Sequence, residues 1–268
     1  MKPALLCALL LSLALAAGCA SNSEDERSPE TNGGAPEANG AAPATSSADS
    51  AQPVSDISEG EAREVAEKVL LQLKDFPVGW SQEPPEDEED TPLDVPPECQ
   101  AFVGEEEWPG TLLEVESPEF EGPDDEAVNS GVVVYADAEA ARQAFADARD
   151  AYDRCKEPLL QAFTGYLQQL YQQKAQESGE AAEVAALTMD WLSFPPYGDE
   201  SLTARMSITI NVGTRSLDCY LDFLGWRVGR IEGDIGFSTC FEIPNLEEEQ
   251  RLAQIMDERL RKAAKDLD

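Results

Sequence analysis

Residues 203–212 read TARMSITINV, and apolar and polar side chains alternate along the whole segment. A period of two predicts a β-strand with one buried and one solvated face, which is typical of antiparallel pairing. The tripeptide GTR at 213–215 predicts a turn, after which the alternation resumes over residues 217–223 and completes a hairpin. A further strand is predicted over residues 228–235, with Gly225 near the turn that precedes it.

Upstream of this hairpin, three more strands are predicted at 111–120, 127–135 and 184–194. Apolar residues at helical spacing predict helices over about 59–73, 138–155, 158–176 and 246–265. Pro158 suits the first turn of a helix, so the two central helices are predicted to be separate. This order of elements predicts an α+β fold, with an antiparallel β-sheet, helices packed mainly on one face, and a single domain.

The helix predicted over 158–176 has a wide apolar stripe that includes Phe163, Tyr166 and Tyr171. Such aromatic residues could line a ligand cleft, but a stripe at this spacing is more often part of a core. Ser58-Glu59-Gly60-Glu61 and Asn245-Leu246-Glu247-Glu248 both match the capping-box pattern that opens a helix.

The amino end has the anatomy of an exported lipoprotein. Lys2 is followed by an uncharged, mostly apolar run over residues 3–17 and then by Gly18 and Cys19. Leu15-Ala16-Ala17-Gly18-Cys19 is similar to a lipobox, with Ala16 at a position where that motif more often has Leu. We therefore expect a signal peptide over residues 1–18 and a lipid on Cys19 that anchors the chain to the extracytoplasmic face of the cell membrane.

Residues 19–56 then form the lipidated cysteine and an acidic linker without aromatic residues, which is expected to be disordered. A single folded domain is predicted over residues 57–268. The formal net charge is −35 for the chain and −30 for residues 57–268. A surface of this charge repels nucleic acid. It suits a high-salt habitat, and cation binding by acid-rich segments such as residues 83–90 is the alternative.

Four cysteines follow Cys19 in the sequence, namely Cys99, Cys155, Cys219 and Cys240. In an oxidising compartment an even number predicts two disulfides, with three connectivities to choose from. Cys219 lies early in one strand of the hairpin region, and Cys240 follows the partner strand as it returns to that level. We therefore predict Cys219–Cys240, which leaves Cys99–Cys155. The chain has no histidine and no Cys-x-x-Cys pair, so no structural zinc, and no cofactor, is expected.

The absence of histidine excludes Ser-His-Asp and Cys-His nucleophiles, and no phosphate-binding glycine loop or dinucleotide fingerprint appears. A catalytic pair of carboxylates stays open, with Asp199 and Glu200, then Asp190, as the foremost candidates. The alternative for Asp199 is a turn residue that bonds its own backbone. Binding is predicted near the turn at 197–201, where these residues gather: Trp191, Phe194, Tyr197 and Asp199. Closing the edge of the core is the alternative role of the aromatic residues.

Several short motifs resemble one family. Residues 71–80 (LQLKDFPVGW) lead into Cys99, residues 194–201 (FPPYGDES) precede the strand meander, and residues 226–230 (WRVGR) precede the closing helix. Together they are similar to actinobacterial extracytoplasmic sensor-domain lipoproteins and to the external domain of PknH-type serine/threonine kinases. The resemblance implies an α+β domain with a groove, disulfides, and sensing of a ligand or partner, and it supplies no catalytic residue. Unlike those kinases, this chain is expected to have neither a kinase domain nor a transmembrane helix.

Three functions therefore stay open. The first is a non-enzymatic binding or sensing module for a cell-envelope ligand or protein partner. The second is a carrier of lipid or another hydrophobic ligand, which requires a large dry cavity. The third is a cell-wall hydrolase that depends on two carboxylates across a cleft.

Overall fold

The computed structural model describes residues 57–82, 93, 95–103, 108–178, 182–240 and 242–267. The predicted signal peptide, Cys19 and the linker, residues 1–56, lie outside these ranges. The elements in chain order are α2 (Glu59–Val69), η1 (Leu73–Asp75), β1 (Ser81–Gln82), η2 (Pro97–Val103), β2 (Thr111–Glu116), β3 (Phe120–Glu121), β4 (Ala127–Tyr135), α3 (Ala138–Ser178), β5 (Ala182–Trp191), β6 (Glu200–Val212), β7 (Arg215–Val228), β8 (Ile231–Cys240) and α4 (Leu246–Leu267).

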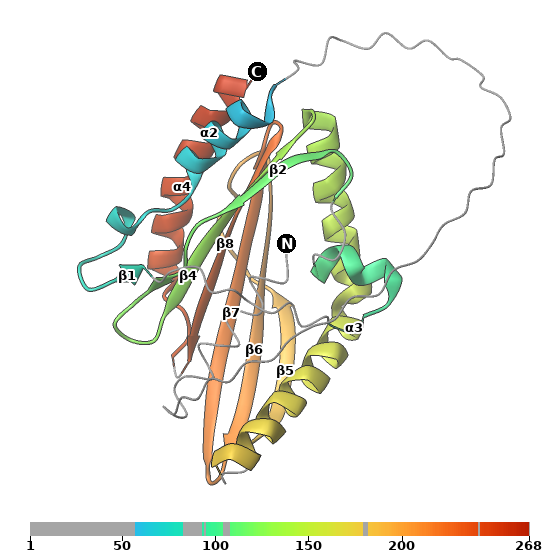
Figure 1. Cartoon of the computed structure of the whole chain (residues 1–268), viewed down its shortest axis with the longest axis vertical. Coiled ribbons are helices and arrows are strands. Elements are labelled where there is room, and N and C mark those ends of the chain that lie inside the picture. The colour runs from blue at the N-terminus through green and yellow to red at the C-terminus, as the bar shows by residue number, and fades with distance from the viewer. Residues whose placement is uncertain are drawn as a thin grey trace, which may run out of the picture.

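The strands form one eight-stranded sheet in the order β1-β3-β4-β8-β7-β6-β5, with β2 paired to β4 outside this path (Figure 1). Every pairing is antiparallel. The predicted α+β class, the antiparallel sheet and the single domain are confirmed. The strand predicted over 111–120 is divided into β2 and β3, and the strand predicted over 127–135 coincides with β4.

The hairpin that the alternation predicted is formed by β6 and β7, where Met206 faces Leu221 and Ile208 faces Cys219 in register. All four side chains are buried. The predicted turn near Gly225 is wrong, because β7 continues to Val228. The strand continues because Leu224 and Trp226, on either side of Gly225, are both buried in the core beneath α2 and α4.

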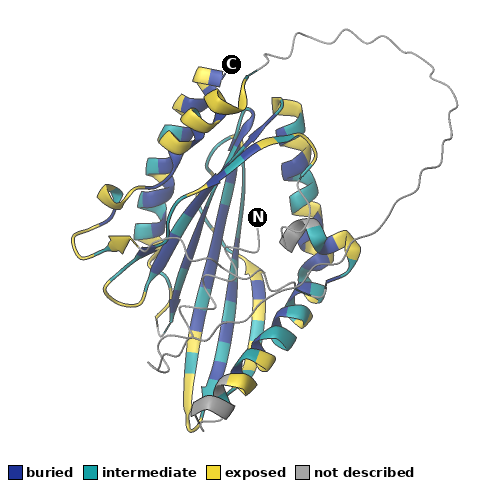
Figure 2. Cartoon of the chain, in the orientation of Figure 1, coloured by how far each residue is buried: buried dark blue, intermediate teal, exposed yellow. Residues whose placement is uncertain are grey.

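Successive side chains of β7 belong to two different hydrophobic cores, one on each face of the sheet. Leu221 and Phe223 pack with α3 and with the inward residues of β6. Leu224 and Trp226 pack with α2, α4, β4 and β8. Because neighbouring side chains on a strand point to opposite faces, α2 and α4 cover one face of the sheet and α3 lies across the other. Figure 2 shows this burial along the central strands, where dark blue, buried residues are interspersed with teal, half-buried ones.

The two helices predicted over 138–155 and 158–176 are one continuous helix, α3, with Pro158 inside it. A proline within a helix removes a hydrogen bond and costs about 3 kcal/mol. Burial opposes this cost on both sides of the proline, since Tyr152, Leu159 and Phe163 are all buried. The stripe of this helix is largely core, as predicted, with Leu167 and Tyr171 buried as well.

The amino ends of the two other helices are capped by side chains. Ser58 and Glu61 form the predicted capping box of α2, which ends at Val69 rather than near residue 73. At α4, Asn245 Oδ1 accepts from the Glu247 amide at 3.1 Å. The second half of the box predicted there is replaced by an ion pair, because Glu248 accepts from Arg251 at 2.6 Å.

Both predicted disulfides are present. Cys219 and Cys240 face each other in register on β7 and β8, and their bond lies in the core beneath α3. Cys99 in η2 is joined to Cys155 in α3, and both are buried with Leu159. The second bond ties the segment before β2 to the middle of α3.

Candidate functional site

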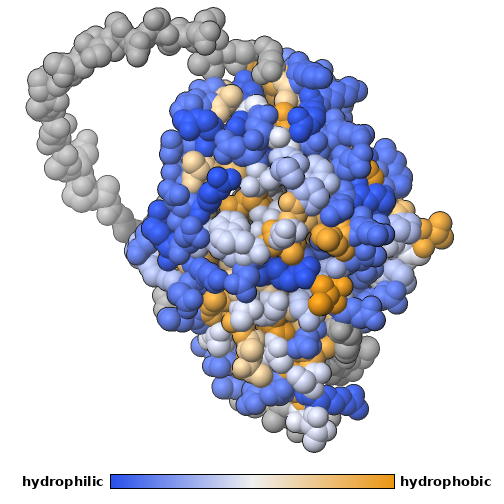
Figure 3. All heavy atoms as spheres, turned by 180° about the vertical axis from the view of Figure 1, so that it is seen from behind, coloured by the Kyte–Doolittle hydropathy of each residue, from blue (hydrophilic) through white to orange (hydrophobic). Residues whose placement is uncertain are grey.

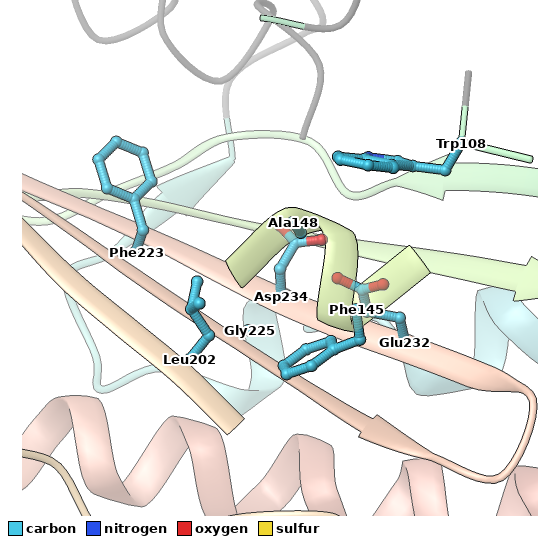
Figure 4. A pocket seen from close by; sticks show the side chains of 8 residues that line it. All are labelled: Trp108, Phe145, Ala148, Leu202, Phe223, Gly225, Glu232 and Asp234. Carbon is cyan, nitrogen blue, oxygen red and sulfur yellow. The ribbon is translucent and has the colours of Figure 1, made fainter. Parts of the chain in front are cut away.

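A groove lies between α3 and the sheet, on the face opposite α4 (Figure 4). Its cavity volume is about 30 Å³. The walls come from five parts of the chain, namely the segment before β2, α3, β6, β7 and β8. The lining residues are Trp108, Phe145, Ala148, Leu202, Phe223, Gly225, Glu232 and Asp234.

Two carboxylates form the floor of this groove. Glu232 and Asp234 alternate on β8 with the core residue Ile231 and therefore point toward α3 rather than α4. Figure 4 shows both side chains rising from β8 on the side of the sheet where Trp108 and Phe145 lie. Tyr135 Oη donates a hydrogen bond to Glu232 Oε2 at 3.0 Å.

A glycine makes room for the second carboxylate. Gly131 faces Asp234 in register on the neighbouring strand β4. A Cβ atom at position 131 would lie 2.5 Å from Asp234 Oδ2, which is closer than real Cβ atoms approach an oxygen. Any larger residue at 131 would therefore displace the Asp234 side chain within the groove.

The floor carboxyls hold their protons more tightly than exposed acids do. Burial, together with the charges of Glu232, Glu116 and Glu114, raises the pKa of Asp234 to about 7. Burial likewise raises the pKa of Glu232, against the lowering effect of the Tyr135 hydrogen bond. Burial and the nearby Glu232 raise the pKa of Tyr135, so its hydroxyl stays a donor.

Cationic side chains close to the groove are engaged elsewhere. Arg227 faces Glu232 in register, but its guanidinium bonds Glu200 at 3.0 Å, Asp199 at 3.4 Å and the Gly229 carbonyl at 2.8 Å. Arg149 lies over the Phe145 ring at 5.9 Å and donates to the Ser201 carbonyl at 3.4 Å. Among the residues that the structure describes, no ion pair involves Glu232 or Asp234.

The binding residues predicted from the sequence do not form one cluster. Trp191 is 47% exposed and packs against Tyr152 of α3, with the rings tilted by 37° and their centroids 3.9 Å apart. Phe194 and Tyr197 pack against the core on the α4 side, where Tyr197 lies 5.8 Å from the Trp226 ring and donates to the Gln250 carbonyl at 3.2 Å. Phe194 and Tyr197 therefore close the edge of the core, which is the alternative role predicted for them.

Asp199 holds two turns together. Its carboxylate accepts from the Gly229 amide at 2.9 Å, and its own amide donates to the Arg227 carbonyl at 2.7 Å. Both candidate catalytic acids, Asp199 and Glu200, are bound by the same guanidinium of Arg227, and Asp190 is bound by Lys156 at 3.0 Å. The carboxylates considered for hydrolysis thus have structural partners.

Sequence reasoning did not single out the residues of the groove. Glu232 and Asp234 appeared only as part of an abundant acidic composition, and Trp108 lay between predicted elements. A signal was present in residues 231–235 (IEGDI), where the acids alternate with apolar residues inside a strand. Acids at those positions point away from the α4 core and toward whatever covers the other face.

A second group of buried polar residues lies on the α4 face. Asp222 is fully buried on β7 and forms a bidentate pair with Arg205 of β6. Glu249, in the first turns of α4, is 1% exposed. Burial raises the pKa of Glu249 to about 9, with a further contribution from the adjacent Asp222.

The described residues hold neither a metal-binding cluster nor a helix that could span a membrane. No group of three or more His, Cys, Asp or Glu residues in the described ranges is placed to hold a metal ion. No helix within those ranges is both long enough and apolar enough to cross a membrane.

The fold is an α+β domain with a shallow groove on one face of its sheet. No family model matches the sequence, and a search of curated proteins finds no match. Among solved structures, the chain is similar to the extracellular domain of PknH from Mycobacterium tuberculosis, with 16% identity and a TM-score of 0.45. The match covers 75% of this chain and 96% of that chain. This similarity is too distant to indicate a function for the groove.

Proposed function

We propose that the protein is a membrane-anchored, extracytoplasmic binding module that recognises a cell-envelope ligand or partner in the groove between α3 and the sheet. The strongest support for this proposal is the groove itself, which has two acids, Glu232 and Asp234, at its floor and aromatic residues in its walls. Two half-buried acids without an ion pair among the described residues destabilise an isolated domain. A bound partner that bonds these two carboxyl groups would offset this loss of stability.

The location outside the cytoplasm is supported by two independent features. The Cys99–Cys155 and Cys219–Cys240 bonds are typical of chains that fold in an oxidising compartment. The lipobox-like residues 15–19 supply the anchor at Cys19.

The two alternative functions have less support. A lipid carrier needs a cavity large enough for an acyl chain, and the groove measures about 30 Å³. This is room for about two water molecules, since each needs about 10–15 Å³. A hydrolase needs two free carboxylates across a cleft, whereas Asp199 and Glu200 share the guanidinium of Arg227.

The groove is tested by filling it in the full chain. Ala148 lines the groove on α3, and Ala148→Trp would occupy it. Gln143 is an exposed residue of the same helix, so Gln143→Trp is the matched control. Both variants and the wild type are immobilised and exposed to fractionated envelope extract. We expect the wild type and Gln143→Trp to retain the same component and Ala148→Trp to lose it.

Equal retention by all three forms would place binding outside the groove and contradict the proposal. Catalysis is tested in the same fractions, with Asp199→Asn as the variant. Turnover of a glycan or peptide by the wild type that disappears in Asp199→Asn would show that the protein is an enzyme.

The anchor is tested by mass spectrometry of the mature amino end. We expect the wild type to begin at a diacylglyceryl-modified Cys19 and to partition with membranes, whereas Cys19→Ala should lack the lipid. An unmodified Cys19 thiol on the mature wild type would contradict the anchor without affecting the groove.

A further inference from the structure

The chemical character of the groove limits what can enter it. Three aromatic side chains, Trp108, Phe145 and Phe223, line a space whose floor is made by two carboxyl groups (Figure 4). The face of an aromatic ring attracts a cation, most strongly for tryptophan. The protein already uses one of these rings in this way, because the Arg149 guanidinium lies 5.9 Å from the centre of Phe145.

The charge of the groove also favours a cationic ligand. Glu114 and Glu116 lie close enough to Asp234 to raise its pKa, so two further acids act on the floor besides Glu232. Arg227, across from Glu232, is already bonded to Asp199 and Glu200. An anionic or strongly dipolar acceptor would be repelled here, whereas a cation would pair with the Asp234 carboxylate.

The size of the site narrows the choice of cation. A volume of about 30 Å³ has room for about two water molecules, since each needs about 10–15 Å³. A primary ammonium group with the methylene next to it is of that size, and a whole sugar ring or acyl chain is not. A bare metal ion fits poorly, because no described cluster of acids is arranged to coordinate one.

We infer that the groove binds a primary alkylammonium group, with its charge on Asp234 and Glu232 and its methylene stem against Trp108. This inference rests on the proposed function and adds the class of ligand to it. The ammonium group belongs either to a small free amine or to a lysine side chain of a polypeptide, and the two sources offer the same chemistry to the groove.

The test is isothermal titration of the full chain with n-butylammonium, with its neutral isostere n-butanol, and with potassium chloride at the same concentrations. We expect heat of binding for n-butylammonium alone. Asp234→Asn keeps the shape of the floor and removes its charge, and should weaken binding at least tenfold. Asp190→Asn, an exposed acid at the edge strand β5, is the control and should bind as the wild type does.

Trp108→Leu provides a second variant with the carboxylates intact, and should also weaken binding. The source of the ammonium group is distinguished by titrating acetyl-Ala-Lys-Ala-amide and its norleucine analogue. Tighter binding of the lysine peptide than of n-butylammonium indicates a polypeptide, and equal binding indicates a small amine.

Two outcomes would overturn the inference. Equal heats from n-butylammonium and potassium chloride would mean that the acids respond to screening alone. Equal binding of n-butanol, or unchanged binding by Asp234→Asn, would mean that the groove does not select a cation. If the envelope component is still lost from Ala148→Trp in either case, the proposed function stands and only the class of ligand is wrong.

Discussion

At the scale of single residues, the most unusual group is the buried carboxyl of Glu249. It faces Asp222 and Arg205 of the sheet, and Glu126 and Glu248 line the same small pocket. Asp222 already accepts both hydrogen bonds of the Arg205 fork. A charge on Glu249 would therefore add a second buried negative charge without a second cation, which explains why its pKa is raised to about 9.

This raised pKa predicts a loss of stability with rising pH. The folded state holds the proton of Glu249 up to about pH 9, while the unfolded chain releases it near the ordinary pKa of 4.5. The folded state thus binds more protons between these values, and the free energy of unfolding falls as pH rises through that window. Glu249→Gln keeps a neutral hydrogen-bonding group and should remove this contribution.

We expect Glu249→Gln to raise the melting midpoint at pH 8 and to leave it nearly unchanged at pH 4. The gain should be on the order of 1 kcal/mol or more, which shifts the midpoint by about 2–4 °C in a chain of this size. Thermal melts over this pH range measure it. A gain that is the same at both pH values would contradict the raised pKa.

Trp191 and Tyr197 provide a matched pair of aromatic residues. Tyr197 packs against Trp226 and donates to the Gln250 carbonyl, so Tyr197→Ala should destabilise the domain by about 2–4 kcal/mol. Trp191 is 47% exposed, and Trp191→Ala should cost about 1 kcal/mol. Denaturant unfolding measures the loss of stability in both variants. A larger loss for Trp191→Ala than for Tyr197→Ala would contradict the packing of Tyr197 against Trp226.

At the scale of elements, the hydrophobic pattern predicts the hairpin well because its period is clean. The alternation of residues 203–212 is the alternation of β6, and it required no knowledge of the rest of the chain. Pro158 was misleading because local propensity favours a break there, whereas burial of Leu159 and Phe163 on the sheet keeps α3 continuous. Pairing outside the hairpin decides which acids share a groove, so Glu232 and Asp234 could not be selected from sequence spacing.

The Cys99–Cys155 bond closes a loop of 56 residues and joins η2 to α3. In the chain-entropy description, a loop of that length contributes about 4 kcal/mol to stability. The Cys219–Cys240 bond closes a shorter loop of 21 residues, so the same description gives about 3 kcal/mol. We therefore expect Cys99→Ala/Cys155→Ala to lose more stability than Cys219→Ala/Cys240→Ala in denaturant unfolding, and the reverse order would contradict this.

At the scale of the whole molecule, the dominant property is the negative charge. Residues 57–268 carry a formal net charge of −30. Figure 3 shows a surface that is mostly hydrophilic, with apolar side chains scattered among polar ones. Like charges on a compact surface repel one another, and this repulsion opposes folding until salt screens it.

Added salt should therefore stabilise the protein. We expect the melting midpoint to rise from low salt to molar potassium chloride, with most of the rise at the low end, where the screening length changes fastest. Thermal melts in potassium chloride measure this rise. A flat or falling midpoint would contradict the account of the acidic surface as a source of repulsion.

The central claim is that the α3 face of the sheet is a binding surface, and hydrogen exchange tests it directly. The full chain is compared with and without the retained envelope component. The account predicts slower exchange in the groove segments, residues 145–149 of α3 and 223–234 of β7 and β8, and unchanged exchange in α4. Protection confined to α4 or to the turn at 197–201, with the groove segments unchanged, would contradict it.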